Sequence, residues 1–175
     1  MAQEVGALLG RGEVLQRAVP PFVHIFPCCM KTLRLILGDQ LNASHPWFET
    51  VSDDAVYLMA EMRQETDYAP HHIQKVLAFF AAMRAFAAAR QAEGHRGGYL
   101  ALDEGRNTQG LEANVRMVMA EEGCERFAYQ LPDEWRLDEQ LRTFASELGD
   151  RSEACDTHHF LTARGDLDEQ FKGKK

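Results

Sequence analysis

The sequence lacks the motifs by which phosphate-bearing ligands are most often bound. It contains neither a GxGxxG nor a GxxxxGK[ST] pattern, so a dinucleotide fingerprint and a P-loop are both absent. Its four cysteines form no CxxC pair and no Cys/His pattern with zinc spacing, which argues against a metal site. No Ser or Cys lies in a nucleophile-elbow pattern. A self-sufficient hydrolase is therefore a weak interpretation.

Long apolar runs and an excess of positive charge are also missing. No stretch approaches the roughly 20 apolar residues that a membrane span needs, and the opening residues lack the pattern of a secretory signal. The net charge of −8 would repel nucleic acid phosphates. We therefore expect a soluble, cytoplasmic protein with no membrane partner and little direct affinity for DNA.

The length of 175 residues, 45% of them hydrophobic, favours one domain that buries roughly 70% of its unfolded surface. Pro20, Pro21 and Pro27 precede the first convincing strand, so residues 1–30 are expected to be a disordered extension. We expect the folded domain to occupy residues 31–165. The charged residues 166–175 look like a truncated linker.

Short apolar runs alternate with longer helical patterns along the domain. Residues 70–91 have apolar positions at the i, i+3, i+4, i+7 spacing of a helix, with Asp67 or Ala69 as its cap, Pro70 in its first turn and apolar residues on more than one side. Strands separated by helices imply right-handed crossovers and a covered parallel sheet. We predict a doubly wound, Rossmann-like α/β fold with roughly five strands. The predicted strands are 33–37, 55–60, 98–102, 126–131 and 152–156, and the other helices are 108–122 and 133–148.

Polar side chains follow each of the first four predicted strands, where ligands bind in open α/β sheets. The set is rich in carboxylates and amides, which suits a neutral ligand with hydroxyl or ring N–H donors better than a phosphate. Simpler roles stay open, because Asp39 and Asp133 can cap turns or helices and Glu61 and Glu65 can be solvated. His71 and His72 favour surface or capping roles. The set comprises Asp39, Gln40, Glu61, Glu65, Tyr68, Asp103, Asn107, Thr108, Asp133, Glu134 and Trp135.

These residues carry a family resemblance that runs from about Lys31 to Phe171. The ordered set of motifs resembles the N-terminal domain of the deoxyribodipyrimidine photolyase-related proteins, the prokaryotic iron–sulfur photolyases and cryptochromes of (6-4) photolyase type. The motifs are Leu35-Ile36-Leu37-Gly38-Asp39-Gln40-Leu41, Glu61 to Glu65 with Tyr68, His71-His72 with Lys75, Leu102-Asp103 to Asn107-Thr108, and Pro132-Asp133-Glu134-Trp135-Arg136.

The resemblance implies a light-harvesting role. In that family this domain holds the antenna chromophore 6,7-dimethyl-8-ribityllumazine, which passes excitation to FAD in a separate helical domain. That domain also carries a [4Fe–4S] cluster, binds DNA and performs the repair, which is a carbon–carbon lyase reaction. This chain by itself is therefore expected to be inactive. Carried over by motif, the lumazine contacts are Gly38, Asp39, Gln40, Glu61, Glu65, Tyr68, Val76, Phe79, Asp133 and Glu134.

Two other functions remain open at this point. The chain can be a small nucleotide-binding α/β protein, which adenine nucleotides or flavins would reveal by titration. Alternatively it is a ligand-free remnant or interaction module, in which the apolar helix over residues 70–91 docks a partner, such as an FAD-binding helical domain on a separate chain.

Overall fold

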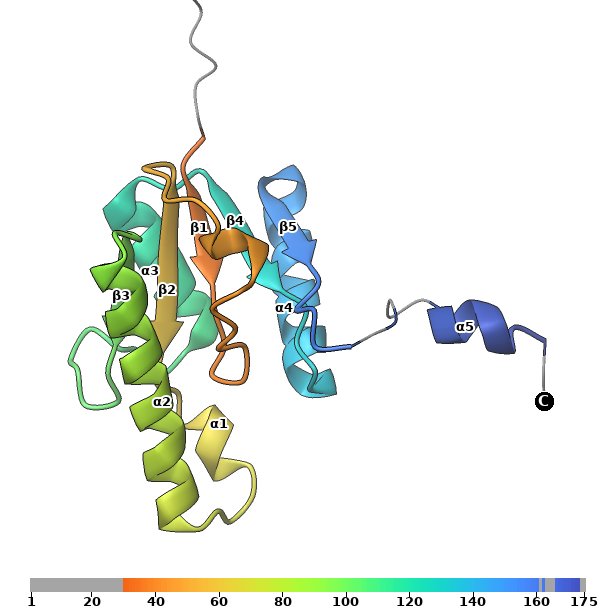
Figure 1. Ribbon diagram of the computed structural model, residues 1–175, viewed down its shortest axis with the longest axis horizontal. Helices are drawn as coiled ribbons and strands as arrows, with labels where there is room; N and C mark the ends of the chain where they lie inside the picture. Colours follow the sequence, from red (N-terminus) through yellow and green to blue (C-terminus); the bar gives the residue numbers. More distant parts are fainter. Residues whose placement is uncertain (1–29, 161, 163–165, 174–175) are drawn as a thin grey trace, which may run out of the picture.

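Five strands and the helices between them make up the part of the chain that the computed structural model describes, namely residues 30–160, 162 and 166–173 (Figure 1). The predicted extension over residues 1–30 lies, apart from Met30, outside these residues. The strands are β1 (Thr32–Leu35), β2 (Ala55–Ala60), β3 (Gly97–Leu100), β4 (Arg126–Gln130) and β5 (Ser152–Cys155); the α-helices are α1 (Gln64–Asp67), α2 (Ile73–Ala92), α3 (Leu111–Glu122), α4 (Trp135–Leu148) and α5 (Asp166–Phe171); and the 3₁₀ helices are η1 (Pro46–Phe48) and η2 (Gly149–Arg151).

The strands form one parallel sheet in the order β3-β2-β1-β4-β5. This arrangement confirms the predicted doubly wound α/β fold. Because β1 lies between β2 and β4, the chain builds outward from β1 first in one direction and then in the other. Ligands of such sheets bind beyond the carboxyl ends of the strands, near the point where the direction reverses. The loops after β1 and β4 meet at that point.

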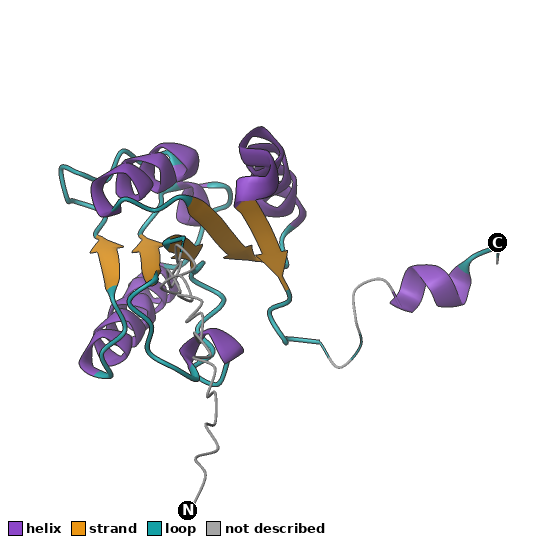
Figure 2. Ribbon diagram, turned by 90° about the horizontal axis from the view of Figure 1, so that it is seen from above, coloured by secondary structure: helices purple, strands orange, loops and turns teal. Residues whose placement is uncertain are grey.

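Helices cover both faces of the sheet, as Figure 2 shows. On one face, α3 and α4 pack on a core that includes Leu33, Val115, Phe127 and Phe144. On the other face, α2 and η1 enclose a smaller core around Ile36 and the other residues of that cluster. Strands buried on both faces read as continuous apolar runs, and β2 is buried along its whole length. This is why the bounds of β2 matched the prediction.

The first strand is shorter than its apolar run. It ends at Leu35, although Ile36 and Leu37 are also buried. The amide of Ile36 still donates to Leu58 O in β2 at 3.0 Å, but the amide of Leu37 donates to the side-chain oxygen of Gln40 at 3.0 Å. A side chain thus replaces the neighbouring strand as the acceptor, so the ladder ends and the turn begins.

The start of α2 differs from the prediction. The helix begins at Ile73, and its cap is His72, whose Nδ1 accepts from the Gln74 amide at 3.2 Å. The prediction that Asp67 or Ala69 caps the helix is wrong, because Asp67 already ends the separate helix α1. Of the surface or capping roles expected for His72, the structure shows the capping role.

The outer face of α2 is apolar, as the sequence predicted. Ile73 and Leu77 are 63% and 62% exposed, while Phe80 and Met83 on the inner face are buried. None of the helices in the described part of the chain has both the length and the apolar character needed to cross a membrane.

Candidate functional site

A cavity of about 180 Å³ opens at the carboxyl edge of the sheet. Its walls come from four segments that are far apart in the sequence: the turn after β1, α1 and the residue that follows it, the first turns of α2, and the start of α4. The lining residues are Asp39, Glu65, Thr66, Tyr68, His71, Lys75, Val76, Phe79, Glu134 and Leu137.

One wall of the cavity is apolar. Val76 and Phe79 project from α2, and Leu137 comes from α4. The ring of Phe79 lies against the turn after β1, where Gly38 leaves room for it. A Cβ on Gly38 would be 2.9 Å from Met83 Sδ and would fall inside the van der Waals surface of the Phe79 ring. Gly38 is therefore needed for a close approach between this turn and α2.

Replacing Gly38 by alanine is expected to cost about 1–3 kcal/mol of stability, because the added methyl group must displace Phe79 and Met83 from a filled space. Urea unfolding measures the loss. Gly98 is the matched control, since a Cβ there meets no atom within 4 Å. If Gly38→Ala and Gly98→Ala unfolded at the same urea concentration, the close approach between α2 and the turn after β1 would not contribute to stability.

Three carboxylates, Asp39, Glu65 and Glu134, also line the cavity. Partial desolvation, together with the charges of Asp133 and Glu134, raises the pKa of Asp39. Desolvation also raises the pKa of Glu65, and the nearby charges of Asp39 and Glu134 add to this rise. Carboxylates in such surroundings are strong acceptors for hydroxyl and N–H donors, while their shared negative charge disfavours an anion.

Aromatic and basic side chains border the mouth of the cavity. Tyr68 is 54% exposed, and the guanidinium carbon of Arg136 lies 4.4 Å from the centre of its ring. Arg136 also pairs with Glu134. The ring of His71 meets Tyr68 edge-on at 5.1 Å, and its Nδ1 lies 3.3 Å from Lys75 Nζ.

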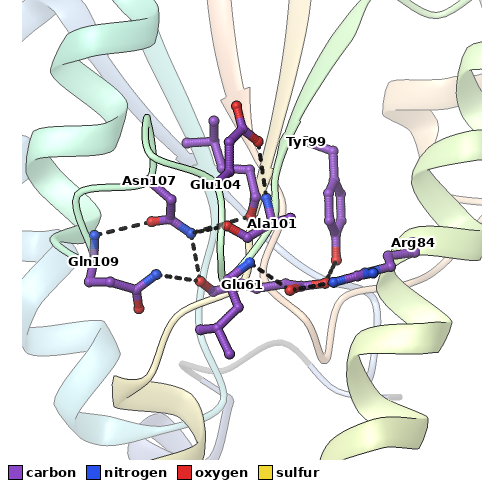
Figure 3. Close-up of polar contacts among 9 residues, drawn as sticks. Glu61, Arg84, Tyr99, Ala101, Glu104, Asn107 and Gln109 are labelled. Carbon is purple, nitrogen blue, oxygen red and sulfur yellow. Dashed lines mark hydrogen bonds and ion pairs between the residues drawn. The ribbon is translucent and has the colours of Figure 1, made fainter.

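Glu61, a predicted ligand contact, does not line the cavity and lies instead in a buried network at the ends of β2 and β3 (Figure 3). Its carboxylate is fully buried and accepts from Arg84 at 2.5 and 2.9 Å, from the Tyr99 hydroxyl at 2.6 Å and from the Leu102 amide at 2.7 Å. Burial acts to raise the pKa of Glu61, but these hydrogen bonds outweigh it and hold the pKa below its usual value. Glu61 therefore joins α2 to the ends of β2 and β3.

Gln40 and Asp133 also make contacts within the protein. Gln40 is 1% exposed and donates to Gln130 O at 3.2 Å, so it ties the turn after β1 to the end of β4. Asp133 Oδ2 lies 2.7 Å from His159 Nδ1 on the segment after β5. Neither residue lines the cavity. Both hold together the loops from which Asp39 and Glu134 reach it.

Four further residues line the cavity without having been predicted as contacts: Thr66, His71, Lys75 and Leu137. Helical spacing carries a signal for most of them. His71 lies just before the cap of α2 and four residues before Lys75 in its first turn, and Leu137 lies three residues after Glu134, the N-cap of α4, so each pair is close enough in sequence to reach the same side of a helix start.

Fold and cavity together define a Rossmann-like α/β domain with a cavity at the carboxyl edge of its sheet. The model of the deoxyribodipyrimidine photo-lyase-related protein family matches residues 34–175, and the chain belongs to this family. This confirms the resemblance inferred from the motifs. A curated relative, the "(6-4) photolyase" of Agrobacterium fabrum (strain C58 / ATCC 33970), is 30% identical over 148 residues. The match covers 83% of this chain but only 29% of that photolyase.

Proposed function

We propose that this domain binds 6,7-dimethyl-8-ribityllumazine as an antenna chromophore. The observation that carries the proposal is the convergence of motif-derived residues on one cavity. The ten positions expected from the family resemblance are scattered over about a hundred residues of sequence, yet six of them line the same space. They are Asp39, Glu65, Tyr68, Val76, Phe79 and Glu134.

The chemistry of the cavity supports such a ligand. Val76, Phe79 and Leu137 offer an apolar surface to a flat ring system, and Tyr68 adds an aromatic face at the mouth. Asp39, Glu65 and Glu134 offer acceptors for ribityl hydroxyls and a ring N–H. Binding sites commonly combine such an apolar lining with a few placed polar groups. When bound, the lumazine would absorb near-ultraviolet to violet light and pass the excitation on.

We assign the acceptor of that excitation to a partner. In this proposal, FAD and a [4Fe–4S] cluster belong to a helical domain beyond these residues or on a separate chain, and that domain performs the DNA repair. The net charge of −8 supports this division, since an acidic domain contributes little to DNA binding. So does the length of the A. fabrum photolyase, of which this chain matches 29%.

Reconstitution with 6,7-dimethyl-8-ribityllumazine tests the proposal. The purified chain should retain the chromophore through gel filtration, with its violet absorption and fluorescence. Val76→Trp should weaken binding by at least about tenfold, or about 1.4 kcal/mol, because the indole would occupy space in the cavity that the ligand needs. Leu77→Trp is the control, because Leu77 is exposed on the outer face of α2.

Two results would overturn this proposal. Equal affinities of Val76→Trp and Leu77→Trp for the lumazine would show that the ligand does not bind in the cavity. Tight binding of adenine nucleotides without any lumazine binding would instead favour a nucleotide-binding protein.

The exposed Ile73 and Leu77 favour a second candidate, an interaction module that docks a helical partner through α2. This function predicts that no chromophore binds and that the chain becomes monodisperse only beside such a partner. Light scattering of the chain with and without an FAD-binding helical domain separates the two cases.

A further inference from the structure

Trp135 belongs to the residues predicted at the carboxyl edge of the sheet, but it does not line the cavity there. It is the first residue of α4 and is 73% exposed, more than any other large hydrophobic side chain in the described part of the chain. Tryptophan is enriched at the energetic centres of protein interfaces, because it offers a large rigid surface together with an N–H donor. The proposed antenna function gives this side chain no role.

The indole of Trp135 lines an open groove of about 420 Å³ between α3 and α4. Three lining residues of α4 follow one another at intervals of four positions, so they form a row along one side of the helix. Gln140 connects the two helices, because its Nε2 donates to Glu112 Oε1 on α3 at 3.4 Å. The groove shares no lining residue with the cavity. Its lining residues are Glu112, Trp135, Arg136, Glu139, Gln140 and Thr143.

Two carboxylates of the groove, those of Glu112 and Glu139, are not matched by positive charge. Neither forms an ion pair with any residue that the structure describes. The arginines of α3 and α4 are already paired with other carboxylates. The pairs are Arg116 with Glu147, Arg136 with Glu134 and Arg142 with Asp138. Uncompensated negative charge therefore lies beside an exposed indole, in a chain whose net charge is −8.

We propose that this groove binds an arginine side chain from a basic segment of a partner protein. A guanidinium on the face of Trp135 would make a cation–π contact, for which indole is the best ring. Its several N–H donors would at the same time reach Glu112 and Glu139 in charge-assisted hydrogen bonds. Lysine fits less well, because its ammonium is a compact, strongly hydrated charge without a planar face.

The domain already holds its own arginines in this way. The guanidinium carbon of Arg136 lies 4.4 Å from the centre of the Tyr68 ring, and Arg136 pairs with Glu134. On α3, Arg116 combines a contact of 4.9 Å to the Phe144 ring with its ion pair to Glu147. In each case an aromatic face and a carboxylate engage one guanidinium. The groove offers the same two components, and the charge of its carboxylates is complementary to an arginine supplied by another chain.

Two short peptides test the proposal, namely acetyl-Gly-Arg-Gly amide and its lysine counterpart. In titrations of the full chain followed by NMR, the arginine peptide should shift the backbone amides of residues 111–115 and 135–143. It should bind at least about threefold more tightly than the lysine peptide, because only the guanidinium combines stacking with several directed donors.

Substitutions in the groove identify the groups that bind the peptide. Trp135→Ala removes the aromatic face, and Glu139→Gln removes one carboxylate; each should weaken binding of the arginine peptide by about threefold or more. Both side chains are exposed, so both variants should fold. Glu147→Gln is the matched control. It makes the same change of charge on the same helix, but at a carboxylate that Arg116 already occupies, and it should leave the affinity unchanged.

Three results would overturn the proposal. Unchanged affinity of Trp135→Ala would show that the indole takes no part in binding. Equal losses in Glu139→Gln and Glu147→Gln would attribute the binding to net charge alone. Equal affinities of the arginine and lysine peptides would remove the preference for a guanidinium. None of these measurements depends on lumazine binding, because the groove and the cavity have no lining residue in common.

Discussion

Replacing Glu61 by glutamine is expected to lower the free energy of unfolding by about 2–4 kcal/mol at neutral pH, because it disrupts a fully buried, charge-assisted hydrogen-bond network. The carboxylate accepts four hydrogen bonds, from two nitrogens of Arg84, the Tyr99 hydroxyl and the Leu102 amide (Figure 3). A glutamine has the same shape but turns one acceptor atom into a donor. The new amide NH₂ group would therefore face N–H or O–H donors of the network, while the unchanged side-chain volume leaves no cavity.

The pH dependence gives this prediction a second readout. Burial acts to raise the pKa of Glu61, but the hydrogen bonds to its carboxylate have the larger effect, so its pKa lies below the usual value. A carboxyl of this kind stabilises the folded state above its unfolded pKa of about 4.3, and the contribution is lost as the pH falls through the folded value. The stability difference between the native protein and Glu61→Gln should therefore shrink in acid.

An exposed ion pair provides the control. Glu147 pairs with Arg116 at 2.6 Å, but both side chains are about half exposed, at 53% and 51%. Such pairs contribute roughly 0–1 kcal/mol, so Glu147→Gln should barely change the urea midpoint. If the two substitutions had equal effects, or if the Glu61 difference persisted unchanged at acid pH, the buried network would not be a main support of the strand ends.

The order of the elements could be predicted because each one leaves a local pattern. The run Ala55–Ala60 is uniformly apolar and became β2 with no change of bounds. The start of α2 was misplaced because Asp67 is of a usual capping type and was expected to begin the helix, whereas the Nδ1 of His72 does what a Ser or Asp oxygen does at that position. Errors of this kind shift a boundary by a few residues and leave the topology intact.

The site could be predicted only in part, because the sequence locates residues at the carboxyl edge but does not give the direction of each side chain. Gln40 turns inward to a carbonyl 90 positions away, and Glu61 meets groups from α2, β3 and the loop after it. These contacts depend on long-range pairing. A polar residue at a strand end can hold the loops together as readily as it can face a ligand.

Asn107 is another polar residue at a strand end that holds loops together. Replacing it by aspartate exchanges a single side-chain atom, yet it should destabilise the fold strongly. Its amide nitrogen donates to Glu61 O at 2.8 Å, Ala101 O at 3.0 Å and Leu100 O at 3.3 Å. Its oxygen accepts from the Gln109 amide at 3.1 Å and from Asn114 Nδ2 at 2.9 Å. Asn107 thus fixes the loop after β3 against the end of β2.

Asn107→Asp would place a carboxylate oxygen against three carbonyl oxygens in a buried site. We expect a loss of about 2–4 kcal/mol at neutral pH, since an unpaired buried charge is costly. The aspartate should have a raised pKa for the same reason. Protonation restores one donor, so the loss of stability should diminish as the pH falls, and urea unfolding at two pH values measures both effects.

Asn42→Asp is the matched control for this substitution. Asn42 uses only its side-chain oxygen, which accepts from the Ser44 amide at 3.0 Å, and an aspartate accepts this bond equally well. The same atom exchange should therefore stay within about 0.5 kcal/mol of the native protein. Equal stabilities of the two variants would contradict the assignment of the Asn107 nitrogen as a donor. A large, acid-reversible loss at Asn107 alone would show that the loop after β3 is held by that amide group.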